Sequence, residues 1–108
     1  MSIKATCFAS LVAFATPVLA SNYTWTPPKF TDDRRVDACM HYSNGANGCD
    51  EFGTRAVAAK FCSLNGYYLE SYDTVWENPV YLVKQLVDNN YWTDKVGGHI
   101  FTRITCHD

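Results

Sequence analysis

The chain lacks the features that mark several large classes of protein. Its 9 basic and 11 acidic side chains give a formal net charge of −2. Nucleic-acid binding through bulk electrostatics needs a basic face that neutralises phosphates, so no nucleic-acid partner is favoured. A G-x-S-x-G elbow and a Walker-type phosphate loop are also missing from the sequence, which argues against two common kinds of catalytic site. A length of 108 residues allows one domain and little more.

Only the first twenty residues contain a long uncharged apolar segment, and its pattern is that of an export signal. Lys4 gives the N-terminus a positive charge, no charged residue follows it as far as Ala20, and Pro17 precedes the peptidase site Val18-Leu19-Ala20. The segment is shorter than the roughly 20 apolar residues that a membrane span needs. We therefore predict a secretory signal peptide over residues 1–20, cleavage after Ala20, and a secreted, extracellular protein with no membrane span.

Cleavage would leave 88 residues with an even number of cysteines, because Cys7 departs and Cys39, Cys49, Cys62 and Cys106 remain. Four thiols in a short exported chain predict two disulfides. Zinc ligands would stand in pairs two to four residues apart, so we expect no metal and no other cofactor. Three connectivities are possible, and we favour a local Cys49–Cys62 bridge with a long Cys39–Cys106 closure. Each bridge would add about 2–4 kcal/mol to stability.

We predict an extended N-terminal arm over residues 21–35, because adjacent prolines and paired charges occur there without apolar periodicity. Trp25 and Phe30 either hold this arm against the domain or form an exposed adhesive element. Asn22 begins an Asn-Tyr-Thr sequon, so it is a candidate glycosylation site.

Residues 36–108 predict a single disulfide-stapled domain of the α+β class. Apolar residues recur at helical spacing from 50 to 64, acidic residues begin this segment, and Asn65-Gly66 ends it. Alternating segments predict strands, whereas one segment fits either a strand or a helix. The strands are expected over residues 36–43, 67–75 and 99–106, the ambiguous segment is 80–87, and turns are expected at Asn89-Asn90 and Gly97-Gly98. The expected fold is one helix packed on an antiparallel sheet of about four strands.

Several motifs follow one another in the order of a known family. They are Arg35-x-Asp37-x-Cys39-Met40-x-Tyr42, Gly48-Cys49, Phe61-Cys62, Gly66-Tyr67 and Phe101-Thr102-Arg103-Ile104-Thr105-Cys106. This order resembles a largely uncharacterised family of small secreted cysteine-containing domains of plants, fungi and bacteria, which read C-L-x-W, C-G-x-x-A-A-x-x-F-C-x-x-x-G-Y and I-T-C. The resemblance favours a strand over residues 80–87 and carries over no catalytic residues. The chain departs from the family in having Tyr42 for tryptophan and in lacking a further cysteine pair between Tyr91 and His99.

Aromatic side chains are the clearest excess, because all three tryptophans and all seven tyrosines follow the leader. Four aromatic residues lie on apolar faces and are expected in the core: Phe52, Phe61, Tyr67 and Phe101. Four others lie in or beside turn-rich stretches, where binding residues concentrate. These candidate binding residues are Trp76, Tyr81, Tyr91 and Trp92. Flat rings with a polar edge suit sugar faces and protein interfaces.

Three histidines, His41, His99 and His107, are candidates for acid–base chemistry near neutral pH. With Glu51, Glu70, Glu77 and Arg103 they would supply a base, an acid and an anion clamp, as in small exported ribonucleases of fungi. Structural or solvated histidines explain the same residues more simply, so we assign no catalytic residue.

These features favour a small secreted binding protein that is monomeric and not an enzyme. Its partner would be an extracellular protein or a glycan, and its role that of an effector or defence factor acting on another organism. Two alternatives remain: a carbohydrate-binding module that uses exposed aromatic residues, and a small secreted ribonuclease-like enzyme.

Overall fold

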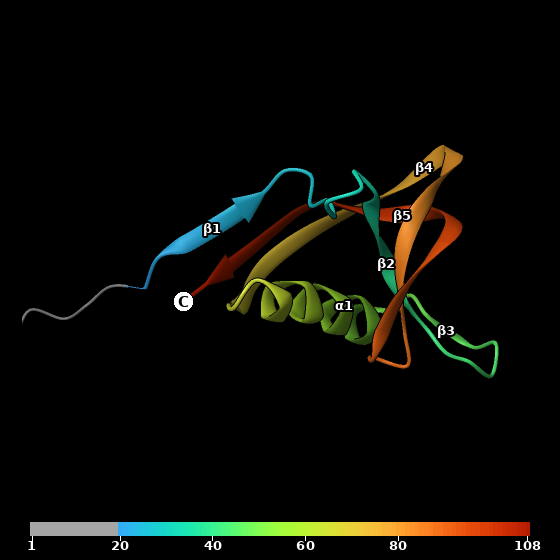
Figure 1. The fold of residues 1–108 in the computed structure, drawn as a ribbon, viewed down its shortest axis with the longest axis horizontal. Coiled ribbons are helices and arrows are strands. Elements are labelled where there is room, and N and C mark those ends of the chain that lie inside the picture. Colours follow the sequence, from blue (N-terminus) through green and yellow to red (C-terminus); the bar gives the residue numbers. More distant parts are fainter. Residues whose placement is uncertain (1–19) are drawn as a thin grey trace, which may run out of the picture.

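The computed structural model describes residues 20–108, apart from the side chains of residues 78–81. One helix, α1 (Glu51–Leu64), packs against a mixed sheet of five strands (Figure 1). The strands are β1 (Asn22–Trp25), β2 (Arg35–His41), β3 (Asn47–Gly48), β4 (Tyr68–Val87) and β5 (Tyr91–His107), in the spatial order β1-β5-β4-β2-β3. The α+β prediction is confirmed. The predicted signal peptide, except Ala20, lies outside the described residues.

The sheet is larger than predicted and is not purely antiparallel. β2 runs parallel to β4, with His41 opposite Val87, whereas the other strand pairs are antiparallel. β2 also meets β5, where Asp37 lies opposite Ile100. A parallel pair needs a crossover connection, and α1 supplies it between β2 and β4. Local alternation in the sequence does not encode such a long-range pairing.

β4 and β5 form one long hairpin, and three residues, Asp88, Asn89 and Asn90, connect its strands. Asp88 and Asn89 both have positive φ, 54° and 52°, and the Asn90 N–H donates to the Val87 carbonyl at 2.9 Å. Positive φ at both central residues is typical of a type I′ turn, whose twist matches that of paired strands. The strand over residues 80–87 and the turn at Asn89-Asn90 are confirmed. The turn at Gly97-Gly98 is wrong, because both glycines lie inside β5.

The helix lies where the sequence predicts it, but one residue predicted to lie in the core is exposed. The Asp50 carboxylate caps its N-terminus by accepting from the Gly53 N–H at 2.9 Å, and Gly66 follows it with φ 85°. Phe52 was expected in the core and is 83% exposed. A side chain at Gly53 would collide with the Gly48 carbonyl, so the helix approaches the sheet through this glycine and turns Phe52 towards solvent.

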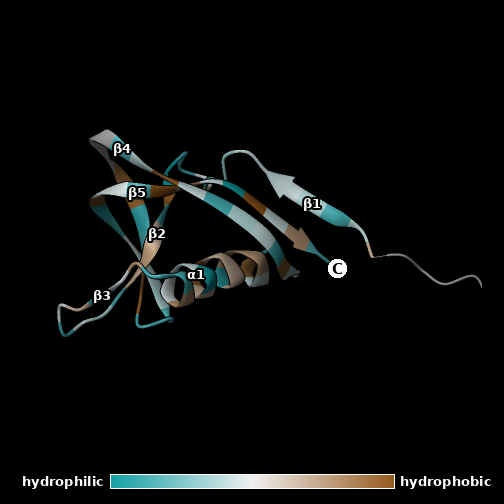
Figure 2. Ribbon diagram, turned by 180° about the vertical axis from the view of Figure 1, so that it is seen from behind, coloured by the Kyte–Doolittle hydropathy of each residue, from teal (hydrophilic) through white to brown (hydrophobic). Residues whose placement is uncertain are grey.

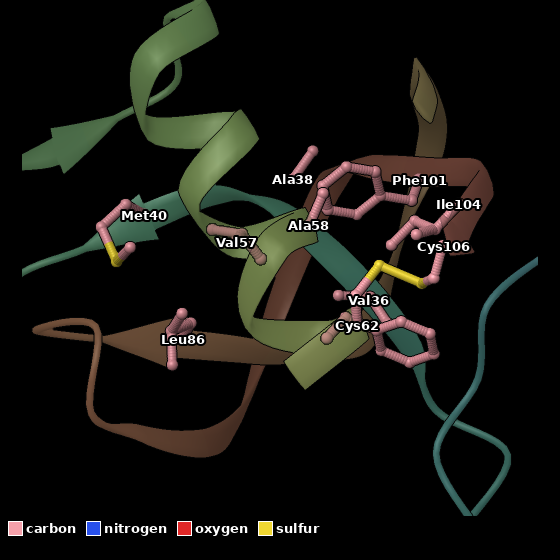
Figure 3. Close-up of a cluster of buried hydrophobic side chains, with 11 residues drawn as sticks. Val36, Ala38, Met40, Val57, Ala58, Cys62, Leu86, Phe101, Ile104 and Cys106 are labelled. Carbon is pink, nitrogen blue, oxygen red and sulfur yellow. A yellow bond between two sulfur atoms is a disulfide. The ribbon is translucent and has the colours of Figure 1, made fainter. Parts of the chain in front are cut away.

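The core lies between α1 and the sheet (Figure 3). It is formed by Val36, Ala38, Met40, Val57, Ala58, Phe61, Cys62, Leu86, Phe101, Ile104 and Cys106. Figure 2 shows the hydrophobic colouring along β5 and β2 and on parts of α1, whereas β1 is pale or hydrophilic. The predicted core positions of Phe61 and Phe101 are confirmed, and Tyr67 is partly buried against the cluster.

The predicted N-terminal arm contributes a strand. β1 pairs with the end of β5, where Tyr23 lies opposite Cys106. Trp25 packs edge-on against Phe61 with ring centroids 5.3 Å apart, and Phe30 is also partly buried against the core. Trp25 and Phe30 therefore hold the arm against the domain, which confirms the first of the two predicted alternatives.

Two disulfides are present, but the favoured pairing is wrong: the bridges are Cys39–Cys49 and Cys62–Cys106. Cys49 precedes α1 and Cys62 lies in its last turn, so the helix holds them about 20 Å apart. A disulfide needs Cα atoms within about 7 Å. Cys39–Cys49 ties β2 to the segment before α1, and Cys62–Cys106 ties α1 to β5. Such bridges are consistent with an oxidising compartment.

The buried face of α1 is tested by two alanine substitutions on the same helix. Phe61→Ala should lower the free energy of unfolding by about 3–5 kcal/mol, because it leaves a cavity in the core. Phe52→Ala is the matched control and should change it by no more than about 0.5 kcal/mol, because its ring is exposed. Urea unfolding followed by circular dichroism measures both. A larger loss for Phe52→Ala than for Phe61→Ala would mean that Phe52, and not Phe61, is packed in the core.

Candidate functional site

The three proposed binding residues whose side chains are described, Trp76, Tyr91 and Trp92, do not form one patch. Trp76, on β4, is 70% exposed, but one face of its indole stacks on the His99 imidazole with ring centroids 4.2 Å apart. Trp92 is partly buried and packs edge-on against Phe30, with centroids 4.9 Å apart. The side chain of Tyr81 lies outside the described residues. The binding role of these four residues stays a prediction; of the three whose side chains are described, Tyr91 lines the groove described next, and Trp76 and Trp92 do not.

The groove that Tyr91 lines is open and has a volume of about 740 Å³. It lies between the β2–β3 hairpin and the tip of the β4–β5 hairpin, and we call it the hairpin groove. Its lining combines two exposed tyrosine rings with amide, hydroxyl, imidazole and ammonium groups. The lining residues are His41, Tyr42, Gly45, Asn47, Gln85, Val87, Tyr91, Thr93, Lys95 and Val96.

A buried carboxylate organises the polar side of this region. Asp37 is 3% exposed. Its Oδ1 accepts from the Cys39 N–H at 2.7 Å, and its Oδ2 accepts from Gln85 Nε2 at 3.3 Å. His41 places Nε2 3.4 Å from the same carboxylate and Nδ1 2.8 Å from Asn47 Oδ1. The Asp37 carboxylate thereby positions two residues that line the groove, Gln85 and His41.

Gly97 explains how β5 passes this carboxylate. A Cβ added at Gly97 would lie 2.6 Å from Asp37 Oδ2 and 3.0 Å from Val83 Cγ2. The first distance is far inside van der Waals contact, so any side chain here would displace the carboxylate. The glycine predicted to form a turn therefore permits a close approach between strands.

Hydrogen bonds join the two walls of the hairpin groove where the end of β2 meets the β4–β5 turn. The Asp88 N–H donates to the His41 carbonyl at 2.8 Å, and the Asp88 carboxylate accepts from the Ser43 N–H at 3.2 Å. Asp88 belongs to the β4–β5 turn, whereas Ser43 follows β2. These two bonds hold one hairpin against the other.

A second polar cluster lies around His99, which is buried. Its Nδ1 is 3.3 Å from Cys39 Sγ, and its Nε2 is 3.2 Å from Thr74 Oγ1. Burial lowers the pKa of His99 below 6.5, and the negative charge of Asp37 partly opposes this shift. Donor atoms of Cys39, Cys49 and His99 lie within 4.8 Å of one another. While the two sulfurs are bonded to each other, however, they offer no thiolate to a metal.

The residues considered for acid–base catalysis are spread over the fold. His107 lies beside Tyr68 at the end of β5, eight residues and roughly 26 Å of extended strand from His99. Arg103 donates to Asp73 at 2.8 Å and to Ser71 at 2.9 Å, so its guanidinium is already engaged. The glutamates lie on separate parts of the fold: Glu51 begins α1, and Glu70 and Glu77 lie on β4. The contacts described do not assemble an anion clamp with a base and an acid.

Asn22, the candidate glycosylation site, is exposed at the start of β1, opposite His107. Its side chain is therefore accessible to a modifying enzyme.

Most residues of the hairpin groove were not predicted from the sequence, because the predicted binding residues are all aromatic. The polar lining includes Asn47, Gln85, Thr93 and Lys95, and the buried support is Asp37. The available signal was the position of two turns, at 44–48 and at Asn89-Asn90, because binding residues concentrate where loops meet.

Comparison of the chain with protein-family models, with curated proteins and with solved structures gives no match. Among the helices of residues 20–108, none has the length and apolar character needed to cross a bilayer. The functional assignment therefore depends on the geometry of this chain.

The His99 environment predicts a pH dependence. Because burial holds the folded-state pKa below 6.5, the unfolded chain binds the proton more tightly than the folded protein does. Stability should be full above about pH 6.5 and should fall as the pH drops from there to the folded-state pKa of His99. Imidazole NMR titration and urea unfolding at several pH values measure the two effects.

Trp76→Ala provides the control, because it uncovers one face of the His99 ring without changing the imidazole. The pKa of His99 should then rise towards 6.5. An unchanged pKa in this variant would show that the indole does not shield the ring.

Proposed function

We propose that the protein is a non-enzymatic extracellular binding protein whose hairpin groove takes a short carbohydrate chain. The observation that carries this proposal is the pair of tyrosines on the groove: Tyr42 is 40% and Tyr91 is 50% exposed. Tyrosine presents an apolar ring with a polar edge, which suits the two faces of a sugar. Asn47, Gln85 and Thr93 add hydrogen-bonding groups of the kind that orient a ligand in such sites.

Binding fits the groove better than cleavage does. Glycoside hydrolysis usually needs two carboxyl groups about 5–10 Å apart across the scissile bond. Among the described residues that line the groove, none is an aspartate or a glutamate. The nearest buried carboxylate, Asp37, is engaged by the Cys39 N–H and by Gln85.

An extracellular location is supported by the two disulfides and by the predicted signal peptide. The resemblance to small secreted cysteine-containing domains agrees with it. A role as an effector or defence factor would follow if the bound glycan belongs to the surface of another organism.

The proposal is tested by glycan-array and polysaccharide pull-down measurements with the oxidised protein. Tyr91→Ala and Tyr42→Ala should each weaken binding about tenfold, because each removes one stacking ring. Tyr68→Ala is the matched control, since this ring is 70% exposed beside His107 and does not line the groove. Its affinity should equal that of the wild type.

Two results would contradict the proposal. One is the absence of binding to any glycan by the folded protein. The other is an equal loss of affinity in the Tyr68→Ala control, which would place the binding surface outside the hairpin groove.

A further inference from the structure

The two disulfides differ sharply in accessibility. Cys62 and Cys106 are both 0% exposed within the core. In the other bridge Cys39 is 4% exposed, whereas Cys49 is exposed at the base of the β2–β3 hairpin. A reagent in solution therefore meets Cys49 before it meets any other half-cystine of the described chain.

The buried sulfur of the accessible bridge has an imidazole beside it. His99 Nδ1 lies 3.3 Å from Cys39 Sγ, and Thr74 Oγ1 lies 3.2 Å from Nε2. When the Thr74 hydroxyl donates to Nε2, the proton of the neutral ring is on Nδ1 and points at the sulfur. A disulfide sulfur accepts this hydrogen bond weakly, whereas a thiolate accepts it strongly. His99 therefore stabilises Cys39 more after the bridge opens than before.

Trp76 and Asp37 act on this pair in opposite directions. The Trp76 ring lies parallel to the imidazole, with an interplanar angle of 7°, and covers one of its faces. Shielding from water strengthens the hydrogen bond to a thiolate. The negative charge of Asp37 opposes a thiolate, but its carboxylate is held by the Cys39 N–H and by Gln85.

We propose that Cys39–Cys49 is an exchangeable disulfide at which an external low-molecular-weight thiol forms a mixed disulfide with Cys49. The incoming thiolate attacks Cys49 Sγ, the bond to Cys39 Sγ breaks, and its electron pair remains on Cys39. The products are a mixed disulfide on Cys49 and a Cys39 thiolate that accepts the His99 Nδ1–H. One disulfide is lost and one is formed, so the incoming thiol is the only co-reactant. Exchange rates depend on access and on the leaving thiolate, and this geometry favours both.

Exchange at Cys49 has a structural consequence for the hairpin groove. The Cys39–Cys49 bridge spans the base of the hairpin that carries Tyr42 and Asn47. Opening it leaves that wall held by the Asp88 hydrogen bonds, the strand pairing and the His41–Asn47 contact, without a covalent bond. An effect on glycan affinity rests on the proposed function, whereas the exchange itself does not.

The exchange is tested with glutathione on the oxidised, folded protein. After acid quenching and alkylation, intact mass and peptide mapping should find one glutathione on Cys49 and an alkylated Cys39. Cys62–Cys106 should remain closed. No adduct, an adduct on Cys39, or earlier opening of Cys62–Cys106 would overturn the proposal.

Variants test the role assigned to His99 as a positioning residue for the leaving thiolate. His99→Gln should slow adduct formation roughly tenfold, because a hydrogen bond to a charged acceptor is lost. Thr74→Val keeps the imidazole but removes the group that fixes its proton, so it should slow the reaction by a smaller factor. It also serves as the test if His99→Gln does not fold. His107→Gln, on the same strand, should react at the wild-type rate.

The rate is compared only among variants in which circular dichroism shows the native fold and Cys62–Cys106 stays closed. Loss of stability alone would open both bridges, whereas loss of the hydrogen bond slows attack at Cys49 alone. Wild-type rates in both His99→Gln and Thr74→Val would overturn the assignment to His99.

Discussion

The buried carboxylate of Asp37 is the constraint on which both candidate sites depend. A buried charge is costly unless hydrogen bonds replace its water, and here the donors are the Cys39 N–H and Gln85. β5 passes close to the same carboxylate at Gly97, where a Cβ would not fit. Groups from β2, β4 and β5 therefore meet at one point. Because a slip of one residue would leave this charge unsatisfied, the carboxylate fixes the register of the three strands.

Side chains that alternate along β2 lie on two faces, one in the core and one among the polar contacts of the candidate sites. Val36 and Met40 belong to the core beneath α1. Asp37, Cys39 and His41 instead make the polar contacts that support the hairpin groove and the His99 cluster. The helix side of the strand thus holds the fold together, while the other side positions the groups of the two candidate sites. Substitutions on the two sides should affect different properties of the protein.

The sequence predicts what is local and fails where distant segments meet. The cap at Asp50 and the stop at Asn65-Gly66 depend on neighbouring residues, so the helix was placed correctly. The length of the predicted helix by itself excludes the Cys49–Cys62 bond, because its ends lie too far apart for a disulfide. The parallel pairing of β2 with β4 leaves no local trace in the sequence. In the candidate site, Tyr91 and Trp92 are both predicted to bind because they lie beside turns, whereas the sheet directs Trp92 to the core and Tyr91 to the groove.

The different loops closed by the two bridges explain how one can react while the other preserves the fold. Cys62–Cys106 spans 44 residues and Cys39–Cys49 spans 10. In the chain-entropy model the longer loop contributes about 1 kcal/mol more to stability. The longer bridge is also sealed in the core between α1 and β5, so the bond that stabilises most is the one that solvent cannot reach. Opening Cys39–Cys49 would remove the smaller contribution and leave Cys62–Cys106 joining α1 to β5.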